Sequence, residues 1–171
     1  IHEKERLKAL NDYEILDTLP EQAYDDLTFL ASQICETPIA AISLIDNERQ
    51  WFKSKIGINV SETHRDVSYC AHTIDSSDEL LEIKDTKLDH RSFDLSLLSE
   101  GVAIQFYAGA PLVHPEGYVL GTICVMDNEP RELTSSQRQA LKSISRQVIS
   151  QMELGKIIKR QADIEFELKK D

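Results

Sequence analysis

The chain has 171 residues, of which 30 are acidic and 19 are basic, and its formal net charge at pH 7 is −11. This length suits one domain with a single hydrophobic core, and the acidic charge disfavours nucleic acid and anionic membranes as partners. The three cysteines, Cys35, Cys70 and Cys124, lack the paired spacing of a zinc or redox site, so we expect reduced thiols in a cytoplasmic protein.

The N-terminal part of the chain predicts helices. Apolar residues at helical spacing indicate an N-terminal helical segment over residues 1–17. Residues 18–21, Thr-Leu-Pro-Glu, have the pattern of a capping box with proline in the first turn, so a second helix is expected to begin there. Its expected core-facing residues are Tyr24, Leu27, Leu30, Ala31 and Ile34.

Two strands joined by the polar turn 46–49 are expected next. Residues 39–45 are almost uniformly apolar and too few for an amphipathic helix, as in a central strand that is covered on both faces. Residues 50–56 alternate between two sets of side chains, so we expect one face of this strand to be wetter than the other. Trp51 and Phe52 then lie on opposite faces, and only one of them is expected to point into the core.

Two polar segments, 61–77 and 84–100, surround a short predicted strand at 80–83. Long segments without regular structure are natural lids over one face of a sheet. Within the first of them, residues 66–74 are expected to form a short helix capped by Asp66. A second hairpin is predicted over residues 102–127, and its turn at 114–117 has proline and glycine where a type I turn favours them.

The last predicted element is a long helix. Thr134 and Gln137 have the spacing of a capping box and no proline follows, so the helix is expected to run from about Ser135 to about Leu168, roughly 50 Å. So long a helix cannot lie wholly on this domain, and its end, residues 155–171, is expected to project and to pair with a second copy in a parallel dimer. The alternative is a solvated tail, because Gly155 costs the helix about 1 kcal/mol and the apolar seam drifts out of register.

Several segments together resemble one family of bacterial signalling domains. They include residues 38–46 (PIAAISLID), 49–54 (RQWFKS), 62–72 (ETHRDVSYCAH), 106–112 (FYAGAPL) and 120–127 (LGTICVMD). The combination is similar to the GAF domains found ahead of histidine kinase and diguanylate cyclase domains, over the chain up to about residue 155. The resemblance implies an α+β, PAS-related fold with a six-stranded antiparallel sheet, the helices of both chain ends on one face, and a ligand pocket on the other. We therefore expect the GAF domain at residues 18–154.

Seven side chains are candidate ligand-binding residues of this pocket: Tyr69, Cys70, His72, Arg91, Phe93, Gln105 and Tyr107. His72 offers an imidazole for hydrogen bonding or pH sensing and Cys70 a reactive thiol, unless both merely pack the lid. Arg91 could clamp an anion and Phe93 could stack on a ring, although a solvated arginine and a core phenylalanine would give the same pattern. The small residues 108–110 after Tyr107 suggest room beside its ring.

The expected function is that of a sensory input domain, which binds a small molecule and relays the signal through its C-terminal helix to a downstream output domain. The ligand and any cofactor stay unidentified, and no catalytic residue or metal site is predicted. The first alternative is a ligand-free dimerisation and spacer module. A free methionine-sulfoxide reductase, which uses the same fold, is the less favoured enzymatic alternative. It needs Cys70 and Cys124 to approach each other, whereas Cys124 by itself suggests an inert strand residue.

The start of the sequence and its lack of a long apolar stretch also bear on the expected location of the protein. The sequence begins at Ile1 without a methionine, and it has no leader and no apolar stretch near the roughly 18 residues that span a bilayer. We therefore expect a cytoplasmic input module cut from a longer protein, with a homodimer through the terminal helices and no contact with the membrane.

Overall fold

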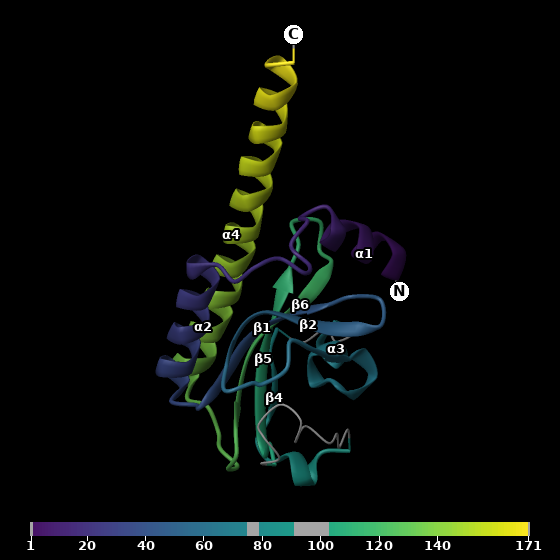
Figure 1. Cartoon of the computed structure of the whole chain (residues 1–171). Coiled ribbons are helices and arrows are strands. Elements are labelled where there is room, and N and C mark those ends of the chain that lie inside the picture. The colour runs from purple at the N-terminus through teal and green to yellow at the C-terminus, as the bar shows by residue number, and fades with distance from the viewer. Residues whose placement is uncertain (1, 75–78, 91–102, 171) are drawn as a thin grey trace.

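The computed structural model describes residues 2–74, 79–90 and 103–170 (Figure 1). Every pair of neighbouring strands is antiparallel, and the strands lie in the order β3-β2-β1-β6-β5-β4. This is the six-stranded α+β fold that the sequence predicts. The elements, in chain order, are α1 (Glu3–Asn11), α2 (Gln22–Cys35), β1 (Ile39–Ile45), β2 (Arg49–Ile56), β3 (Glu62–His64), the 3-10 turn η1 (Arg65–Val67), α3 (Tyr69–Thr73), β4 (Leu81–Ile83), the 3-10 turn η2 (Thr86–Leu88), β5 (Phe106–Val113), β6 (Val119–Asp127) and α4 (Ser135–Leu168).

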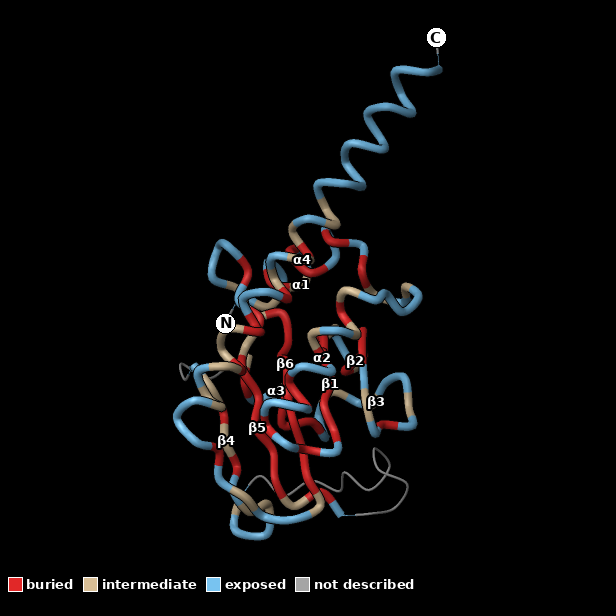
Figure 2. Tube along the Cα trace, turned by 90° about the vertical axis from the view of Figure 1, so that its left-hand side faces the viewer, coloured by how far each residue is buried: buried red, intermediate tan, exposed pale blue. Residues whose placement is uncertain are grey.

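Two hydrophobic clusters cover opposite faces of the sheet. Helices α1, α2 and α4 contribute to one cluster, with Leu10, Tyr24 and Leu141 among its buried residues. The short helix α3 contributes Tyr69 and Cys70 to the other. All of β1 is buried, as predicted for a strand between two layers, and Figure 2 shows the buried trace running through the centre of the sheet.

Helix α2 begins later than the sequence predicts. Its N-cap is Glu21, whose side chain makes no capping hydrogen bond. The Thr18 hydroxyl instead donates to the Ile15 carbonyl oxygen over 2.5 Å, within the turn between α1 and α2. The capping box predicted at residues 18–21 is therefore wrong, because this threonine closes the preceding turn rather than opening the helix.

The buried face of α2 also differs from the prediction. Leu30 and Ile34, expected in the core, are 45% and 41% exposed, whereas Thr28 and Cys35 are buried. The helix packs against α4 and against the strands β1, β2 and β6. This packing, rather than the apolar periodicity of the helix alone, selects the face that is buried.

Strand β2 has no wet face along its centre, contrary to the prediction. A β-bulge opposite Ile42 and Ser43 interrupts its pairing with β1. Trp51 and Phe52 are both buried, one in each hydrophobic cluster, because both faces of this strand are covered. Lys53 is buried as well, with its ammonium group 2.6 Å from the Glu21 carboxylate.

The segment after β2 contains a strand and a cap that the sequence did not reveal. Strand β3 pairs with the first half of β2, within the stretch predicted to be an irregular lid. Helix α3 is capped by Ser68, whose side-chain oxygen accepts a hydrogen bond from the backbone N–H of Ala71. The predicted cap, Asp66, lies inside the preceding turn η1.

Helix α4 has the predicted length and start. Both hydrogen bonds of the capping box between Thr134 and Gln137 are present. The first half of the helix is buried along one face, at Leu141, Ile144, Ser145, Val148 and Met152. From residue 157 to residue 170 every residue is exposed, and Figure 2 shows this end projecting away from the sheet. Within the part of the chain that the structure describes, no helix could span a membrane.

Candidate functional site

Four side chains meet between α3 and the sheet and form what we call the Cys70 cluster: Cys70, Tyr107, Thr122 and Cys124. The hydroxyl groups of Tyr107 and Thr122 donate hydrogen bonds to the Cys70 sulfur over 3.0 and 3.1 Å. The sulfur of Cys124 lies 3.9 Å from the sulfur of Cys70. All four residues are buried. The cluster therefore places two hydroxyl donors and a second thiol around a single sulfur atom.

The register of β5 and β6 explains how three of these residues come together. Gly109 of β5 lies opposite Cys124 of β6. Two positions away in each direction, Tyr107 lies opposite Met126 and Pro111 lies opposite Thr122. Alternate residues of a strand share one face. A Cβ atom on Gly109 would lie 2.3 Å from the Tyr107 hydroxyl, so the glycine leaves the space that this hydroxyl occupies. The room that the sequence predicted beside the tyrosine ring is taken up by the tyrosine itself.

A hydrogen-bond chain connects α3 to the other half of the sheet. The Ser43 hydroxyl of β1 donates to the Gln50 side-chain oxygen of β2 over 2.6 Å. The Ser68 hydroxyl, at the start of α3, donates to the same oxygen over 2.9 Å. Gln50 is buried, where its side-chain oxygen needs hydrogen-bond donors. Its hydrogen bond with Ser68 therefore holds the N-terminal end of α3, and with it Cys70, over the sheet.

The surroundings of Cys70 favour its thiolate. Burial by itself would raise the pKa of this thiol, but the neighbouring Cys124 thiol and the hydrogen bonds from Thr122 and Tyr107 outweigh burial and lower the pKa to about 6. The hydrogen bond with Cys70, followed by burial, raises the pKa of Cys124 well above its ordinary value. Burial, followed by the nearby charge of Cys70, raises the pKa of Tyr107. The cluster thus holds one acidic thiol beside one thiol that keeps its proton.

The structure brings some of the predicted site residues together. The ring of Tyr69 lies 5.3 Å from that of Tyr107, centroid to centroid, and His72 lies on the same short helix, α3, as Tyr69 and Cys70. Gln105 is partly buried just before β5, where its backbone N–H donates to the Asp127 carbonyl. Arg91 and Phe93 lie outside the described residues.

One of the predicted strand faces needs correction. The alternation of residues 104–112 predicts Ile104 and Phe106 on the strand face opposite Tyr107. Ile104 instead packs in the same cluster as Tyr107, because β5 begins only at Phe106 and the alternation does not extend back to residue 104. Sequence reasoning also missed Gln50 and Thr122 as parts of the site. A register for β1, β2, β5 and β6 would have been needed to find them, and the sequence alone does not give one.

The cavity next to the Cys70 cluster is small. Its volume is about 10 Å³, and Cys70, Tyr69, Tyr107, Gln50 and Phe52 are among its lining residues. This is the lower limit for one water molecule. A ligand of ordinary size therefore does not fit into this cavity in the described conformation.

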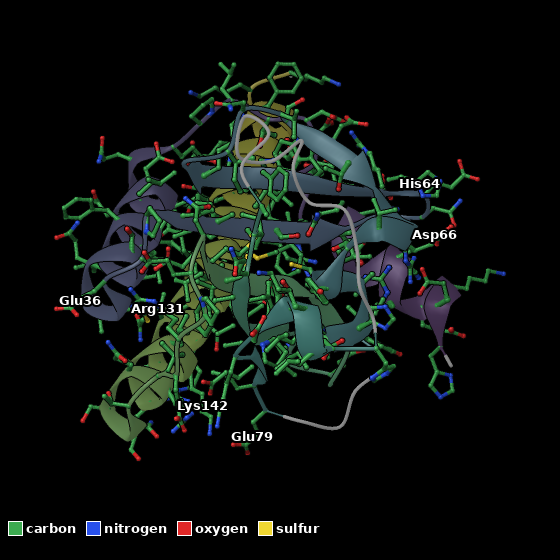
Figure 3. The ribbon with its side chains drawn as sticks, turned by 90° about the horizontal axis from the view of Figure 1, so that it is seen from below. Glu36, His64, Asp66, Glu79, Arg131 and Lys142 are labelled. Atoms are coloured by element: carbon green, nitrogen blue, oxygen red, sulfur yellow. The ribbon has the colours of Figure 1, made fainter. Side chains whose placement is uncertain are left out.

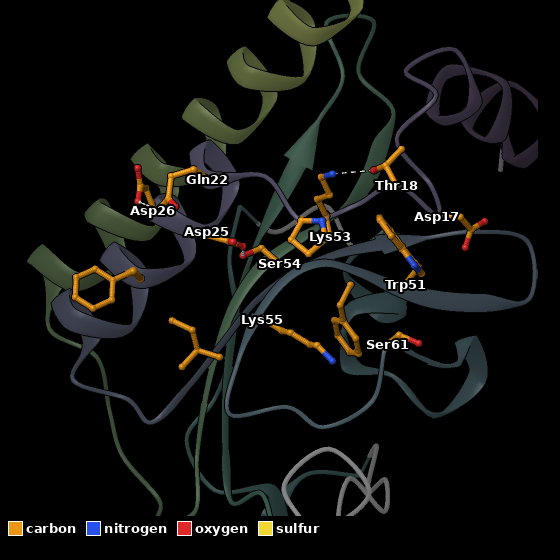
Figure 4. A pocket seen from close by; sticks show the side chains of 14 residues that line it. Asp17, Thr18, Gln22, Asp25, Asp26, Trp51, Lys53, Ser54, Lys55 and Ser61 are labelled. Carbon is orange, nitrogen blue, oxygen red and sulfur yellow. Dashed lines mark hydrogen bonds between the residues drawn. The ribbon is translucent and has the colours of Figure 1, made fainter.

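A larger hollow lies on the opposite side of β2 from the Cys70 cluster (Figure 4). Its volume is about 730 Å³, and it lies between α2, the turn before α2 and the free edge of β2. The Lys53 ammonium at its wall donates to the Thr18 hydroxyl and the Leu19 carbonyl over 2.7 and 2.6 Å. No pattern in the sequence predicted this hollow. Its lining includes Asp25, Asp26, Phe29, Trp51, Phe52, Lys53, Ser54 and Lys55.

No metal centre is visible in residues 2–74, 79–90 and 103–170, where no group of three or more His, Cys, Asp or Glu side chains could hold an ion. The three cysteines are all free thiols. Cys35 lies in the cluster on the helical face, far from Cys70 in the fold, and burial raises its pKa to about 11.

Comparison with known proteins gives a consistent result. The model of the GAF domain family matches residues 19–152. A cyclic di-GMP phosphodiesterase of Pseudomonas aeruginosa is 36% identical over 129 residues, which is 75% of this chain but only 22% of that protein. The chain therefore spans about a fifth of the length of this curated relative.

Solved structures share the fold at low sequence identity. A domain assigned to a two-component sensor histidine kinase of Sinorhizobium meliloti has a TM-score of 0.64 at 16% identity, covering 83% of this chain and 97% of that one. The GAF domain of an Acinetobacter phosphoenolpyruvate-protein phosphotransferase has a TM-score of 0.62 at 15% identity, covering 91% and 98%. A type II free methionine-R-sulfoxide reductase of Thermoplasma acidophilum has a TM-score of 0.60 at 12% identity, covering 76% and 92%.

Proposed function

The chain belongs to the GAF domain family, and from this premise we propose that it is the sensory input domain of a bacterial signal-transduction protein. In this proposal a small molecule binds between the sheet and α3, and α4 relays the change to an output domain in the same protein. The relatives in kinases and a cyclic di-GMP phosphodiesterase support an output of this signalling type. We propose residues 18–154 as the sensory domain and residues 155–171 as the relay extension.

The observation that carries the proposal is the division of α4 into two halves. The first half packs into the core on the sheet, while the second half projects and leaves several apolar side chains in solvent. The two halves form one continuous helix of 34 residues. A movement of its packed half is therefore transmitted along the helix to whatever follows it.

Ion pairs connect α4 to the edge strand β4, which lies next to β5, the strand that contributes Tyr107 to the proposed site. Arg138 of α4 lies 2.7 Å from the carboxylate of Glu82 in β4, and Glu82 is paired with Ala108, the neighbour of Tyr107 in β5. Lys142 and Glu79 lie 3.2 Å apart at the same edge. Both side chains are labelled in Figure 3. A displacement of β5 at Tyr107 thus has a short route to α4 through β4.

The turn between α1 and α2 contacts α4 where the helix leaves the core. The Tyr13 hydroxyl donates to the Glu153 carboxylate over 2.5 Å. Lys159 donates to the Glu14 carbonyl oxygen over 2.8 Å. These contacts fix the direction in which the projecting half leaves the domain.

The exposed half of α4 suits pairing with a second copy. Five residues follow the alternating three- and four-residue spacing of a coiled-coil seam: Leu154, Ile157, Gln161, Ile164 and Leu168. The four apolar members are all exposed in the single chain. Arg160 and Glu165 flank the seam at positions that face each other between two parallel helices, and their opposite charges favour that pairing. We propose a parallel homodimer through this seam.

Binding of a ligand at the Cys70 cluster requires α3 to move away from the sheet, because the cavity there is only about 10 Å³. The same small volume supports the alternative of a ligand-free spacer module. It also disfavours a reductase that accepts a free amino acid, although two thiols do lie side by side. The hollow of about 730 Å³ beside β2 is a second candidate position for a small molecule, since its volume is typical of ligand sites.

Native mass spectrometry of the protein purified from its own cells tests the proposal. The sensor predicts a reproducible non-covalent adduct of a few hundred daltons, bound to a dimer. An adduct that persists in Tyr107→Trp, which fills the site under α3, and disappears in Phe29→Trp, which fills the other hollow, would move the ligand to the β2 side. A dimer that carries no adduct and shows no thermal shift with a metabolite library would support the spacer instead.

A further inference from the structure

The two thiols of the Cys70 cluster are placed for a reaction with each other. Their sulfur atoms lie 3.9 Å apart, and a disulfide needs about 2.05 Å between them. Cys124 is fixed in the central strand β6, whereas Cys70 lies on α3, a helix of five residues. A shift of α3 toward the sheet by about 2 Å, or rotation of the two side chains, closes this distance.

We propose that Cys70 and Cys124 are a redox modification site, in which a hydroperoxide converts the two thiols into an intramolecular disulfide. The Cys70 thiolate attacks one oxygen of hydrogen peroxide; the O–O bond breaks, an S–O bond forms, and the leaving hydroxide takes up a proton to become water. The Cys124 sulfur then attacks the sulfenic acid on Cys70; the S–O bond breaks, the S–S bond forms, and the Cys124 proton leaves in a second water. Two thiols lose two electrons, and one peroxide gains them.

The surroundings assign a different role to each sulfur. Cys70 accepts hydrogen bonds from Tyr107 and Thr122, so its sulfur is the one that carries negative charge and attacks the peroxide. Cys124 lies 3.6 Å from the Ala41 carbonyl oxygen, which accepts from its thiol, and its raised pKa keeps it protonated until the second step. Cys124 is therefore the resolving thiol rather than the inert strand residue that the sequence suggested.

The small cavity selects the oxidant. Cys70 lines a space of about 10 Å³, so hydrogen peroxide reaches it with far less displacement of α3 than a bulky disulfide such as glutathione disulfide requires. Cys35 is the internal reference, because it is equally buried but lies in the other hydrophobic cluster, where burial raises its pKa to about 11. The inference is independent of the proposed function, since the disulfide forms whether or not the site also binds a small molecule.

The test treats the folded chain with hydrogen peroxide, unfolds it, labels the remaining thiols with iodoacetamide and maps the linked peptides by mass spectrometry. We expect a Cys70–Cys124 link with one labelled thiol, Cys35, and the same link in Cys35→Ser as the matched control. In Cys124→Ser the reaction stops at a sulfenic acid on Cys70, which dimedone traps. Oxidation of Cys70 at least tenfold faster than that of Cys35 is expected, and glutathione disulfide should give no mixed disulfide. Three labelled thiols in the treated wild-type chain, or a link that involves Cys35, would overturn the proposal without bearing on the ligand or on the dimer.

Discussion

The sulfur atoms of Cys70 and Cys124 lie 3.9 Å apart, although the two residues are 54 positions apart in the sequence. Gln50 and Ser68 hold α3 against the sheet, and Gly109 leaves room for the Tyr107 hydroxyl, which donates a hydrogen bond to the Cys70 sulfur. The Cys70 cluster lies on one face of the sheet. Strand β4 links it to α4, the helix that packs on the other face and projects from the domain. The following predictions test these relationships one at a time.

Replacement of Tyr107 by Phe should raise the pKa of Cys70. The substitution removes one of the hydroxyl donors that stabilise the thiolate, whose pKa is lowered to about 6. The pH midpoint of the peroxide reaction should therefore move upward, and the rate at pH 7 should fall several-fold. Tyr118→Phe is the matched control, because Tyr118 lies in the other hydrophobic cluster. Equal midpoints for Tyr107→Phe and wild type would show that the hydrogen bond does not set the charge of Cys70.

Replacement of Glu3 by Gln should destabilise the domain by about 1 kcal/mol near pH 7. The Glu3 carboxylate accepts hydrogen bonds from Arg6 and Arg65, and the Arg6 side chain is only 6% exposed. The bond with Arg6, opposed by burial and supported by Arg65, lowers the pKa of Glu3 from 4.5 to about 2. A lowered folded pKa gives stability that is complete above pH 4.5 and is lost as the pH falls through about 2.

Urea unfolding at several pH values checks this prediction. The difference between wild type and Glu3→Gln should shrink steadily below pH 4.5 and vanish near pH 2. Glu5→Gln, in the same first turn of α1 but exposed, serves as control and should cost less than about 0.5 kcal/mol. A difference that does not depend on pH would mean that the ion pairs contribute nothing.

Replacement of Gly155 by Ala should stabilise the domain by about 0.5–1 kcal/mol. A Cβ atom at this position meets nothing within 4 Å, so only the helix propensity changes. Gly121→Ala is the opposite case, because its Cβ would lie 1.9 Å from the Ser43 carbonyl oxygen, where β6 pairs with β1. That substitution should destabilise by roughly 2–3 kcal/mol. Thermal unfolding of the two variants should show opposite signs, and a loss of stability in Gly155→Ala would indicate that α4 needs flexibility there.

The double substitution Ile157→Lys and Ile164→Lys should weaken dimerisation. Both side chains lie on the proposed seam and are 57% and 60% exposed in the single chain. Two buried charges in a coiled-coil core should reduce the association constant by about a hundredfold, equivalent to roughly 2.8 kcal/mol. Ala162→Lys, on the outer side of the same helix, should change it little, and truncation after Leu154 should act like the double variant. Analytical ultracentrifugation makes the comparison, and unchanged association after truncation would rule out the seam.

Most of the fold could be predicted because the signals were local. The capping box at Thr134 and Gln137, the apolar run of β1 and the proline-glycine turn between β5 and β6 each fix an element through a few neighbouring residues. The capping box predicted at residues 18–21 failed because the Thr18 hydroxyl bonds to Ile15, a contact that a turn of the same composition permits equally well.

The site was harder to predict because it depends on register. Cys70, Tyr69 and Tyr107 do lie together, but Thr122, Gln50 and Cys124 joined them only once strand pairs and a bulge were known. Lys53 shows the same limit. A lysine in an alternating strand indicates exposure to solvent, whereas the buried Lys53 side chain reaches the exposed carboxylate of Glu21, which is distant in the sequence. Small residues next to Tyr107 indicated space, and the sequence could not show that the tyrosine itself fills it.

Hydrogen–deuterium exchange of the dimer, with and without the small molecule that copurifies with it, tests the central claim most directly. The account predicts that occupancy of the site changes exchange in α3 and, together with it, in the turn between α1 and α2 and in α4 from residue 135 to residue 168. A change confined to α3 and the strands beneath it, with α4 unaltered, would contradict the relay.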